Sequence, residues 1–275
     1  MTKRILAIHD LSGFGTSSLM SVIPIMSRYG VQVTALPSAI LSASTCYEGS
    51  AWLDTTDFMH RSIEHYIHLK RNFNAIYSGF LGSPTQVDTV REALRKLANE
   101  DTLVLIDPVM ADDGKLYSCY DQSMVIAMRG LISEADIITP NFTEACLLAD
   151  AEYHMHYTQD QLSGICSSLC NLGAKNIIIT SVPDDQGQGS RVLLYSPEGG
   201  ISYYECDYIP AFYPGTGDVF SSLLLALMLN GTGLGQAIPK AINFIHRAIT
   251  FSIASGEDHR EGLLLESLLW REDLR

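Results

Sequence analysis

The feature that most constrains the fold is an alternation of short β-branched runs with segments of helical spacing. Six runs are typical of buried strands: 4–8, 31–36, 74–78, 102–107, 136–139 and 176–181. The clearest helical segment starts at Pro84 and has one apolar stripe, made of Val87, Val90, Leu94 and Leu97. This alternation predicts an α/β protein with a mainly parallel sheet covered by helices on both faces.

Two further features complete the expected architecture. Residues 191–207 contain two strand-like runs around the turn Ser-Pro-Glu-Gly-Gly, which predicts a hairpin at the edge of the sheet. The segment that follows is helical in pattern. Because no repeat, low-complexity tract or linker interrupts the sequence, we predict a single domain over residues 1–275, a length that can bury a substantial core.

Polar residues follow each predicted strand. The clusters lie at 9–18, 37–49, 78–84, 107–115, 139–144 and 180–190. In an open parallel sheet, ligands bind where the strands end and the helices begin. We therefore expect these clusters to converge on one ligand-binding edge of the sheet.

The segment FYPGTGDVFSSLLLALMLNG (212–231) predicts a buried helix with an unusual start. Residues after Asp218 are apolar on almost every face up to Leu229, yet the helix opens with Gly-Thr-Gly-Asp at 215–218. Glycines let backbone N–H groups approach a ligand closely, and the helix dipole adds about half a positive charge there. A simple N-cap is the alternative reading of Asp218, but a cap does not require two glycines. We interpret the segment as a phosphate-binding turn beside a base.

The net charge of −13 argues against a partner that is nucleic acid or an anionic membrane. An anionic ligand must then be held by local amides or by metal ions. No apolar run approaches the ~20 residues of a membrane span, and the N-terminal run is too short for a signal peptide. The six cysteines lack zinc-site spacing and are interpreted as small buried side chains of a cytoplasmic protein.

Other phosphate-binding motifs do not fit. The sequence has no P-loop and no protein-kinase catalytic loop. The stretch GFGTSS after the first strand carries Ser18 where a dinucleotide fingerprint has its third glycine, which argues against a nicotinamide enzyme.

The chain resembles the pyridoxal kinases, a branch of the ribokinase superfamily. The resemblance covers nearly the whole chain and rests on RILAI, SGFLGS, IDPVM, ADIITPNFTEACLL and PGTGDVFSSLLLALM, in that order. It implies a ribokinase-like three-layer α/β/α fold and an enzyme that phosphorylates the 5′-hydroxymethyl group of a B6 vitamer (pyridoxal, pyridoxine or pyridoxamine) in pyridoxal 5′-phosphate salvage. It also implies ATP, Mg²⁺, a monovalent cation such as K⁺, and a homodimer.

The resemblance assigns roles by position. Asp218 is implied as the general base, with the amides of Gly215, Thr216 and Gly217 stabilising the γ-phosphoryl group. The implied ATP-binding residues are Asn141, Thr180, Ser181, Tyr213, Gly215 and Gly217. The implied metal and cation residues are Asp107, Thr139, Asn141 and Glu144, with Thr180 also near the phosphates. Taken from the residues alone, Asn141 and Glu144 are equally well an N-cap and its box partner three positions on.

The implied substrate residues are Asp10, Thr45, Phe80 and Asp218. Pyridoxal kinases commonly carry serine at the position of Asp10 and tyrosine at that of Phe80. An aspartate after the first strand is similar to hydroxymethylpyrimidine kinases of thiamine metabolism, which remain the alternative. A non-catalytic nucleotide-binding protein on the same fold is a second alternative, against which the intact Asp218 argues. Residues 111–117 are interpreted as a flap hinged at Gly114 that excludes water.

Overall fold

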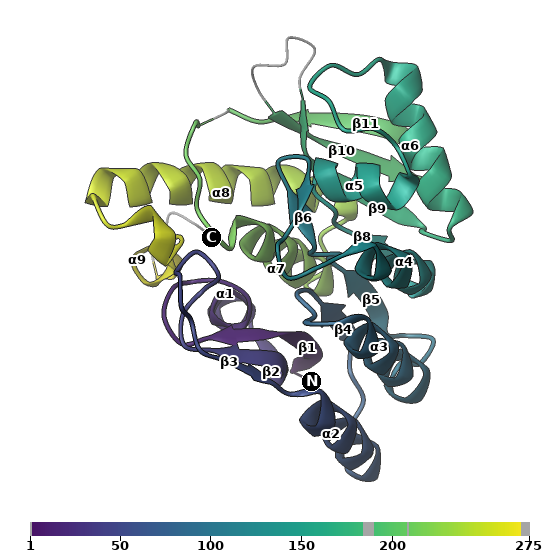
Figure 1. Cartoon of the computed structure of the whole chain (residues 1–275), viewed down its shortest axis with the longest axis vertical. Coiled ribbons are helices and arrows are strands. Elements are labelled where there is room, and N and C mark those ends of the chain that lie inside the picture. The colour runs from purple at the N-terminus through teal and green to yellow at the C-terminus, as the bar shows by residue number, and fades with distance from the viewer. Residues whose placement is uncertain (1, 184–189, 208, 271–275) are drawn as a thin grey trace.

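The fold is built on a nine-stranded sheet, seen in a computed structural model that describes residues 2–183, 190–207 and 209–270 (Figure 1). Across the sheet the strands are β11 (Gly200–Glu205), β10 (Ser190–Ser196), β9 (Asn176–Pro183), β8 (Ile137–Ile138), β5 (Leu103–Ile106), β4 (Ala75–Ser78), β1 (Lys3–Ser12), β2 (Val31–Leu41) and β3 (Trp52–Asp54). The six strands from β9 to β2 are parallel, whereas β3 and the β10–β11 hairpin are antiparallel edges. The predicted parallel sheet and edge hairpin are confirmed.

Helices cover both faces of the sheet, which makes three layers. One face carries α2 (Thr56–His68), α3 (Pro84–Leu97), α4 (Gln122–Leu131), α5 (Phe142–Ala149) and α6 (Gln159–Asn171). The other carries α1 (Leu19–Arg28), α7 (Thr216–Leu229), α8 (Leu234–Ser255) and α9 (Leu265–Leu269). The described residues also contain two short 3₁₀ turns, η1 (Ile132–Glu134) and η2 (His259–Glu261). None of the helices in the described residues is both long and apolar enough to cross a membrane.

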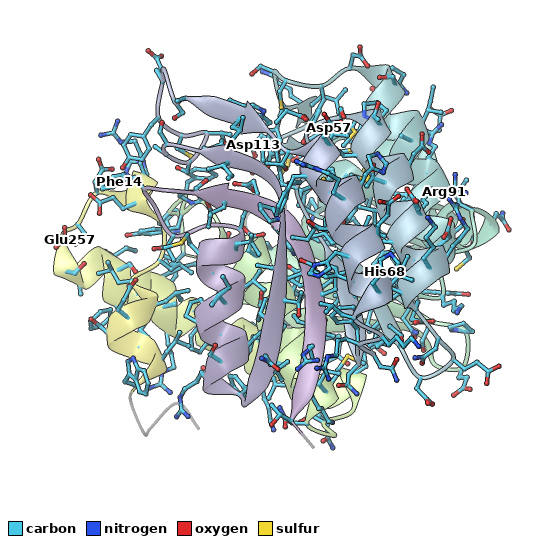
Figure 2. All side chains as sticks on the ribbon, turned by 90° about the horizontal axis from the view of Figure 1, so that it is seen from below. Phe14, Asp57, His68, Arg91, Asp113 and Glu257 are labelled. Atoms are coloured by element: carbon cyan, nitrogen blue, oxygen red, sulfur yellow. The ribbon has the colours of Figure 1, made fainter. Side chains whose placement is uncertain are left out.

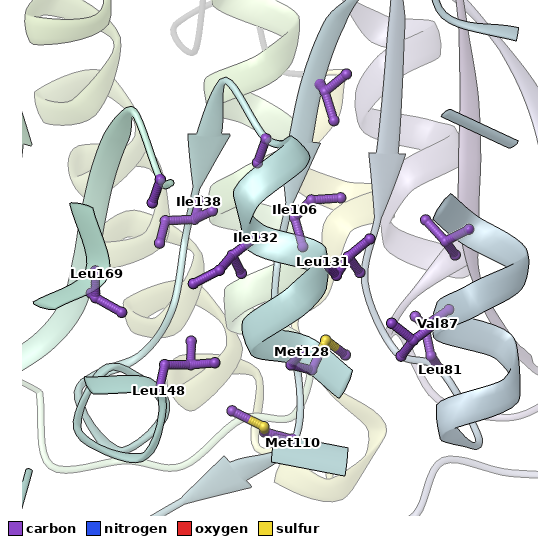
Figure 3. Close-up of a cluster of buried hydrophobic side chains, with 14 of the residues drawn as sticks. Leu81, Val87, Ile106, Met110, Met128, Leu131, Ile132, Ile138, Leu148 and Leu169 are labelled. Atoms are coloured by element: carbon purple, nitrogen blue, oxygen red, sulfur yellow. The ribbon is translucent and has the colours of Figure 1, made fainter. Parts of the chain in front are cut away.

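Each face of the sheet has its own apolar core, which explains the continuous apolar runs of the central strands. In β1, Leu6 and Ile8 point into the core beneath α2–α6, and Ile5 and Ala7 point into the core beneath α1 and α7. Figure 3 shows part of the first core, where side chains of α4 lie beside those of β5 and β8. Strands buried on both faces cannot show polar alternation.

Helix α3 forms as its sequence pattern predicts. The side chain of Ser83 accepts a hydrogen bond from the N–H of Gln86, and Pro84 occupies the first turn, where its missing N–H costs nothing. The predicted apolar stripe is buried against the sheet: Val87, Val90, Leu94 and Leu97. Burial of each such side chain is worth about 1.5–3 kcal/mol, so the stripe fixes which face of the helix meets the sheet.

Some strands differ from the sequence prediction. Strand β3 was not predicted because all of its residues are exposed, which leaves no apolar pattern to detect. Residues 111–117 contain a small hairpin of β6 (Ala111–Asp112) and β7 (Lys115–Leu116), turned by Asp113 and Gly114, both with positive φ. Figure 2 shows Asp113 in this turn, and Asp57 and His68 near the two ends of α2.

The order of the strands creates a crevice. The chain leaves β1 toward β2 on one side and later returns to β4 on the other, so β1 and β4 are neighbours at a reversal of strand order. Open α/β sheets bind ligands at the carboxyl ends of the strands at such a point. His9 and Asp10 of β1 and Gly79, which follows β4, lie at this end of the sheet.

Candidate active site

The start of α7 requires glycine at position 215. Gly215 is the N-cap of the helix and has φ +82°, in the left-handed region. A Cβ at this position would lie 2.6 Å from the carbonyl oxygen of Thr16. Gly217 has no such constraint, because a Cβ there would meet only Asp107 Oδ2 at 3.9 Å, but it borders the adjacent cavity. The turn therefore keeps its N–H groups at the cavity by backbone geometry.

Asp218 is held by a distant segment and is not the cap of its own helix. It lies in the first turn of α7, whose N-cap Gly215 has no side-chain cap, so the N-cap reading is wrong. Its Oδ2 accepts a hydrogen bond of 2.7 Å from the N–H of Ser18, at the start of α1. Its Oδ1 lies 3.7 Å from Nδ1 of the buried His9. Asp218 is thus a fixed carboxylate, 11% exposed, beside a row of N–H groups, where it can accept a proton.

A second carboxylate, Asp107, follows β5 and is buried next to the start of α7. The hydroxyl of Ser221 lies 3.3 Å from Asp107 Oδ2 and 2.9 Å from the hydroxyl oxygen of Thr139. Burial raises the pKa of Asp107 well above its ordinary value, and the charges of Glu144 and Asp218 raise it further. Buried carboxylates that repel one another are stabilised by a bound cation, so this group of acids favours cation binding.

Asn141 and Glu144 form a complete capping box at the start of α5. The side chain of Asn141 accepts from the N–H of Glu144, and Glu144 Oε2 accepts from the N–H of Asn141 at 2.8 Å. Glu144 Oε1 also accepts from the N–H of Met110 at 2.9 Å. Burial nevertheless raises the pKa of Glu144 to about 8. The capping function is observed, whereas a role in holding a metal stays a prediction for both residues.

The oxygen atoms around Asp107 fit a divalent cation whose other ligands are phosphate oxygens and waters. Within the described residues, no group of three His, Cys, Asp or Glu side chains is placed to hold a metal. Mg²⁺ is usually bound by one or two carboxylates together with phosphate oxygens and waters. Asp107, with the hydroxyls of Thr139 and Ser221 beside it, supplies oxygen atoms of this kind next to the glycine turn.

A cavity of about 670 Å³ opens beside the start of α7. Predicted site residues line its polar part: Asn141, Thr180, Ser181, Tyr213, Thr216 and Gly217. Apolar side chains of α7 and α8 line another part: Phe220, Ile242, Ile245 and Ile249. A polar region joined to an apolar wall, within the ~300–1,000 Å³ of small-molecule sites, suits a nucleotide. Residues 184–189 of the predicted polar cluster 180–190 lie outside the described residues.

The predicted substrate residues are only partly brought together. Asp10 is 6% exposed near the end of β1, where the register with β2 shifts between His9 and Leu11. The hydroxyl of Ser12 donates to Asp10 Oδ2 at 3.0 Å, and burial raises the pKa of Asp10. Phe80 is buried between the rings of Trp52 and Tyr120, each with its centroid 5.7 Å away. Thr45, by contrast, is exposed in the turn after β2.

The predicted flap is anchored to α5. The N–H of Gly114 donates to the hydroxyl of Thr143 at 3.0 Å, and a Cβ at Gly114 would lie 2.6 Å from the ring of Tyr153. The N–H groups of Met110 and Ala111 both donate to Glu144. These contacts place the hairpin beside the cavity that Asp113 lines. Its closure over a substrate stays a prediction.

Sequence reasoning missed three residues that contact the predicted ones. Ser18 holds Asp218 through its backbone N–H and adopts φ 49°, which is uncommon outside glycine. Ser221 links Asp107 to Thr139. The signal for Ser221 was present, since a serine pair interrupts an otherwise apolar helix one turn after Asp218. No sequence signal indicates that His9, at the end of an apolar strand, approaches Asp218.

A doubly covered parallel sheet, a nucleotide-sized cavity and a fixed acid beside N–H groups define a kinase of small molecules. Such a site supplies the positioning and charge stabilisation that phosphoryl transfer needs. The family model for phosphomethylpyrimidine kinase matches residues 23–262. The chain therefore belongs to the phosphomethylpyrimidine kinase family.

Solved structures and a curated relative agree with this assignment. A protein from Bacteroides thetaiotaomicron, described as a phosphomethylpyrimidine kinase and solved with pyridoxal, is 41% identical, covers 100% of this chain and 96% of its own, and has a TM-score of 0.94. Pyridoxal kinase from Lactobacillus plantarum is 30% identical over 98% of this chain and 96% of its own, with a TM-score of 0.89. Pyridoxal kinase from Dictyostelium discoideum is 26% identical over 90% of this chain and 86% of its own. The predicted ribokinase-like fold is confirmed.

Proposed function

We propose that the protein transfers the γ-phosphoryl group of ATP to the 5′-hydroxymethyl group of a B6 vitamer. The observation that carries this proposal is the full-length relative solved with pyridoxal, at 41% identity. The chain's own geometry supports it, because Asp218 is fixed by the N–H of Ser18 in the same turn whose Thr216 and Gly217 line a nucleotide-sized cavity.

The reaction uses groups that the fold already holds in place. The cavity binds ATP, and the N–H groups of residues 215–217 stabilise the negative charge on the phosphoryl group in transfer. Asp218 accepts the proton of the vitamer's primary alcohol as the alcohol oxygen bonds to phosphorus and the bond to the leaving ADP breaks. The proton leaves Asp218 after product release.

We assign the proposed cations to the acidic and hydroxyl side chains around the glycine turn. Asp107 and Thr139 would hold Mg²⁺ with the phosphates of ATP, while Asn141 and Glu144 shape its surroundings through the capping box. Mg²⁺ supplies charge neutralisation between the phosphates and the buried acids. A monovalent cation such as K⁺ would lie near Thr180, whose N–H is held by the carbonyl oxygen of Pro140.

Hydroxymethylpyrimidine is the second candidate substrate, because the matching family model is that of phosphomethylpyrimidine kinase. The buried carboxyl group of Asp10 could accept a hydrogen bond from the amino group of this pyrimidine, and a stronger, charge-assisted one from a protonated pyridine ring. The pyridoxal-bound relative favours the vitamer.

The test is a coupled assay with ATP and Mg²⁺ on four alcohols: pyridoxal, pyridoxine, pyridoxamine and hydroxymethylpyrimidine. We expect ADP release and one phosphoryl group on at least one vitamer, identified by mass spectrometry, with kcat/KM above that for the pyrimidine. Phosphorylation of the pyrimidine alone would replace the proposal with its alternative. ATP binding without turnover on any alcohol would make the protein a nucleotide-binding protein.

We also propose a homodimeric assembly and a cytoplasmic location. Exposed apolar side chains cluster on β2 and the edge strand β3, namely Ile40, Trp52 and Leu53, and a homodimer would cover them. Light scattering on a Leu53→Lys variant is expected to show monomers where the wild type shows dimers. The cysteines are all free, which fits a reducing cytoplasmic location.

A further inference from the structure

His9 is a buried histidine for which the sheet provides no partner. It lies at the end of β1 with no exposed surface, and within the described residues neither of its ring nitrogens has a hydrogen bond. An unpaired buried polar group is destabilising, so its presence calls for a reason. An apolar side chain would pack here without that cost.

The surroundings of His9 direct its ring at the proposed base. The ring of Tyr77 packs edge-on against the imidazole with centroids 4.2 Å apart. On the neighbouring strand, a Cβ at Gly79 would lie 2.3 Å from His9 Nδ1, so glycine alone leaves room for the ring. The charged atom nearest to this nitrogen is Asp218 Oδ1, at 3.7 Å. Tyr77 and Gly79 therefore hold the ring in one orientation.

The two carboxylate oxygens of Asp218 have different contacts. Oδ2 is fixed by the N–H of Ser18 at 2.7 Å, whereas Oδ1 lies 3.7 Å from His9 Nδ1. A shift of less than about 1 Å would bring Oδ1 within hydrogen-bond range of Nδ1, and catalytic hydrogen bonds that are long in a free enzyme commonly shorten in the substrate complex.

We propose that His9 is a positioning residue for Asp218. In the substrate complex, the Nδ1–H of His9 donates to Oδ1, so that both carboxylate oxygens are fixed and a free lone pair of Oδ1 faces the substrate hydroxyl. The proton from the alcohol goes to Asp218, and His9 keeps its own proton throughout. This inference rests on the proposed kinase function. It assigns to His9 a role that is exerted through Asp218, the proposed base.

Replacement of His9 separates a hydrogen-bonding role from a packing role. His9→Leu keeps an apolar group against Tyr77 and removes the donor, and it is expected to lower kcat about 10–100-fold while KM for ATP and pyridoxal stays within about 3-fold. His9→Asn places an amide where Nδ1 stands and is expected to keep kcat within about 3-fold of the wild type. His9→Gln places its amide one bond farther out and is expected to behave as Leu does.

A double-mutant cycle tests whether His9 acts through Asp218. In an Asp218→Asn background, His9→Leu is expected to cause no further loss of kcat, because the base that it positions is absent. The matched control is His60→Leu, which breaks a histidine–carboxylate contact of 3.1 Å with Glu92 away from the site and is expected to leave kcat unchanged. Thermal unfolding and ADP binding confirm that each variant is folded.

The outcomes distinguish this inference from the function on which it rests. Wild-type inactivity toward all four alcohols would overturn the proposed function and this inference with it. With an active wild type, the inference alone is overturned if folded His9→Leu keeps full kcat, if His9→Asn loses as much as His9→Leu, or if the losses multiply in the Asp218→Asn background. If His9→Leu does not fold, the kcat of His9→Gln is compared with that of His9→Asn instead, because His9→Gln is expected to lose kcat as His9→Leu does.

Discussion

The proposed nucleotide end of the site is shaped mostly by backbone groups, whereas the proposed substrate end is built from side chains. At the nucleotide end, the turn before α7 takes its form from Gly215, and Glu144 is fixed by the N–H groups of Met110 and Asn141. At the substrate end, Asp10 depends on the hydroxyl of Ser12, and Phe80 depends on neighbouring rings.

The difference between the two ends separates the chemistry of phosphoryl transfer from the choice of substrate. Backbone N–H groups stabilise a phosphoryl group whatever alcohol receives it, so many side-chain changes leave that chemistry intact. Side chains around the ring of the substrate decide which alcohol is held in place. Changes at the nucleotide end are therefore expected to affect all substrates alike, and changes at the substrate end to affect them unequally.

The largest effect is expected for Asp218→Asn. The amide can still accept the hydrogen bond from the N–H of Ser18, but it cannot take the proton, so kcat is expected to fall about 10²–10⁴-fold for every vitamer. Steady-state kinetics and ADP titration check this, with ADP affinity kept. Asp88→Asn, on the exposed face of α3, is the control. Full activity of folded Asp218→Asn would show that Asp218 is not the general base.

Gly215→Ala tests the backbone geometry of the turn. It combines a positive φ with a contact at 2.6 Å to Thr16, so it is expected to lower both kcat and the melting temperature. Gly231→Ala is a matched control, because Gly231 also has positive φ (+90°) but open space around it. The control is expected to cost about 1–2 kcal/mol in folding free energy with kcat unchanged. Equal effects of the two changes would show that the contact with Thr16 is unimportant.

The buried acids predict that the ligand-free protein loses stability as pH rises. In the folded state the pKa of Glu144 is raised from 4.5 to about 8, and that of Asp107 is also raised. Between pH 5 and 8 the folded state therefore holds protons that the unfolded state has released, so the free energy of unfolding falls across this interval.

Thermal unfolding at pH 6 and pH 8 measures this loss, with and without Mg²⁺ and ADP. The melting temperature of the ligand-free wild type is expected to fall by several degrees, and Mg²⁺ with ADP is expected to restore much of it at pH 8. Asp107→Asn removes one of the charges, so its melting temperature is expected to fall less. A pH-independent melting temperature in the wild type would contradict the buried-acid description.

Much of the nucleotide end could be predicted from sequence because its determinants are local. A glycine turn before an apolar helix and an Asn-x-x-Glu box are contiguous patterns, and the structure places Asn141, Thr180 and Thr216 on one cavity. The strand–helix alternation likewise predicts the sheet and its edge hairpin. The single-domain assignment and the roles of the site residues stay predictions.

The substrate end could not be predicted in the same way, because it depends on packing between distant segments. Thr45 lies exposed in the turn after β2, and its implied substrate contact stays a prediction. The neighbours of Phe80 come from the unpredicted strand β3 and from the loop before α4. His9 approaches Asp218, and Ser18 holds it, across about 200 residues of sequence, a separation that no local pattern encodes.

The most direct test of this comparison is the ratio of kcat/KM for pyridoxal to kcat/KM for hydroxymethylpyrimidine in the wild type, Asp107→Asn and Asp10→Asn. We expect Asp107→Asn to lower both constants and leave their ratio within about 2-fold, because it acts on the phosphates. Asp10→Asn is expected to change the ratio about 10-fold, the worth of one hydrogen bond to a buried charged group. A ratio that moves equally in both variants, or in neither, would contradict the separation of the two ends.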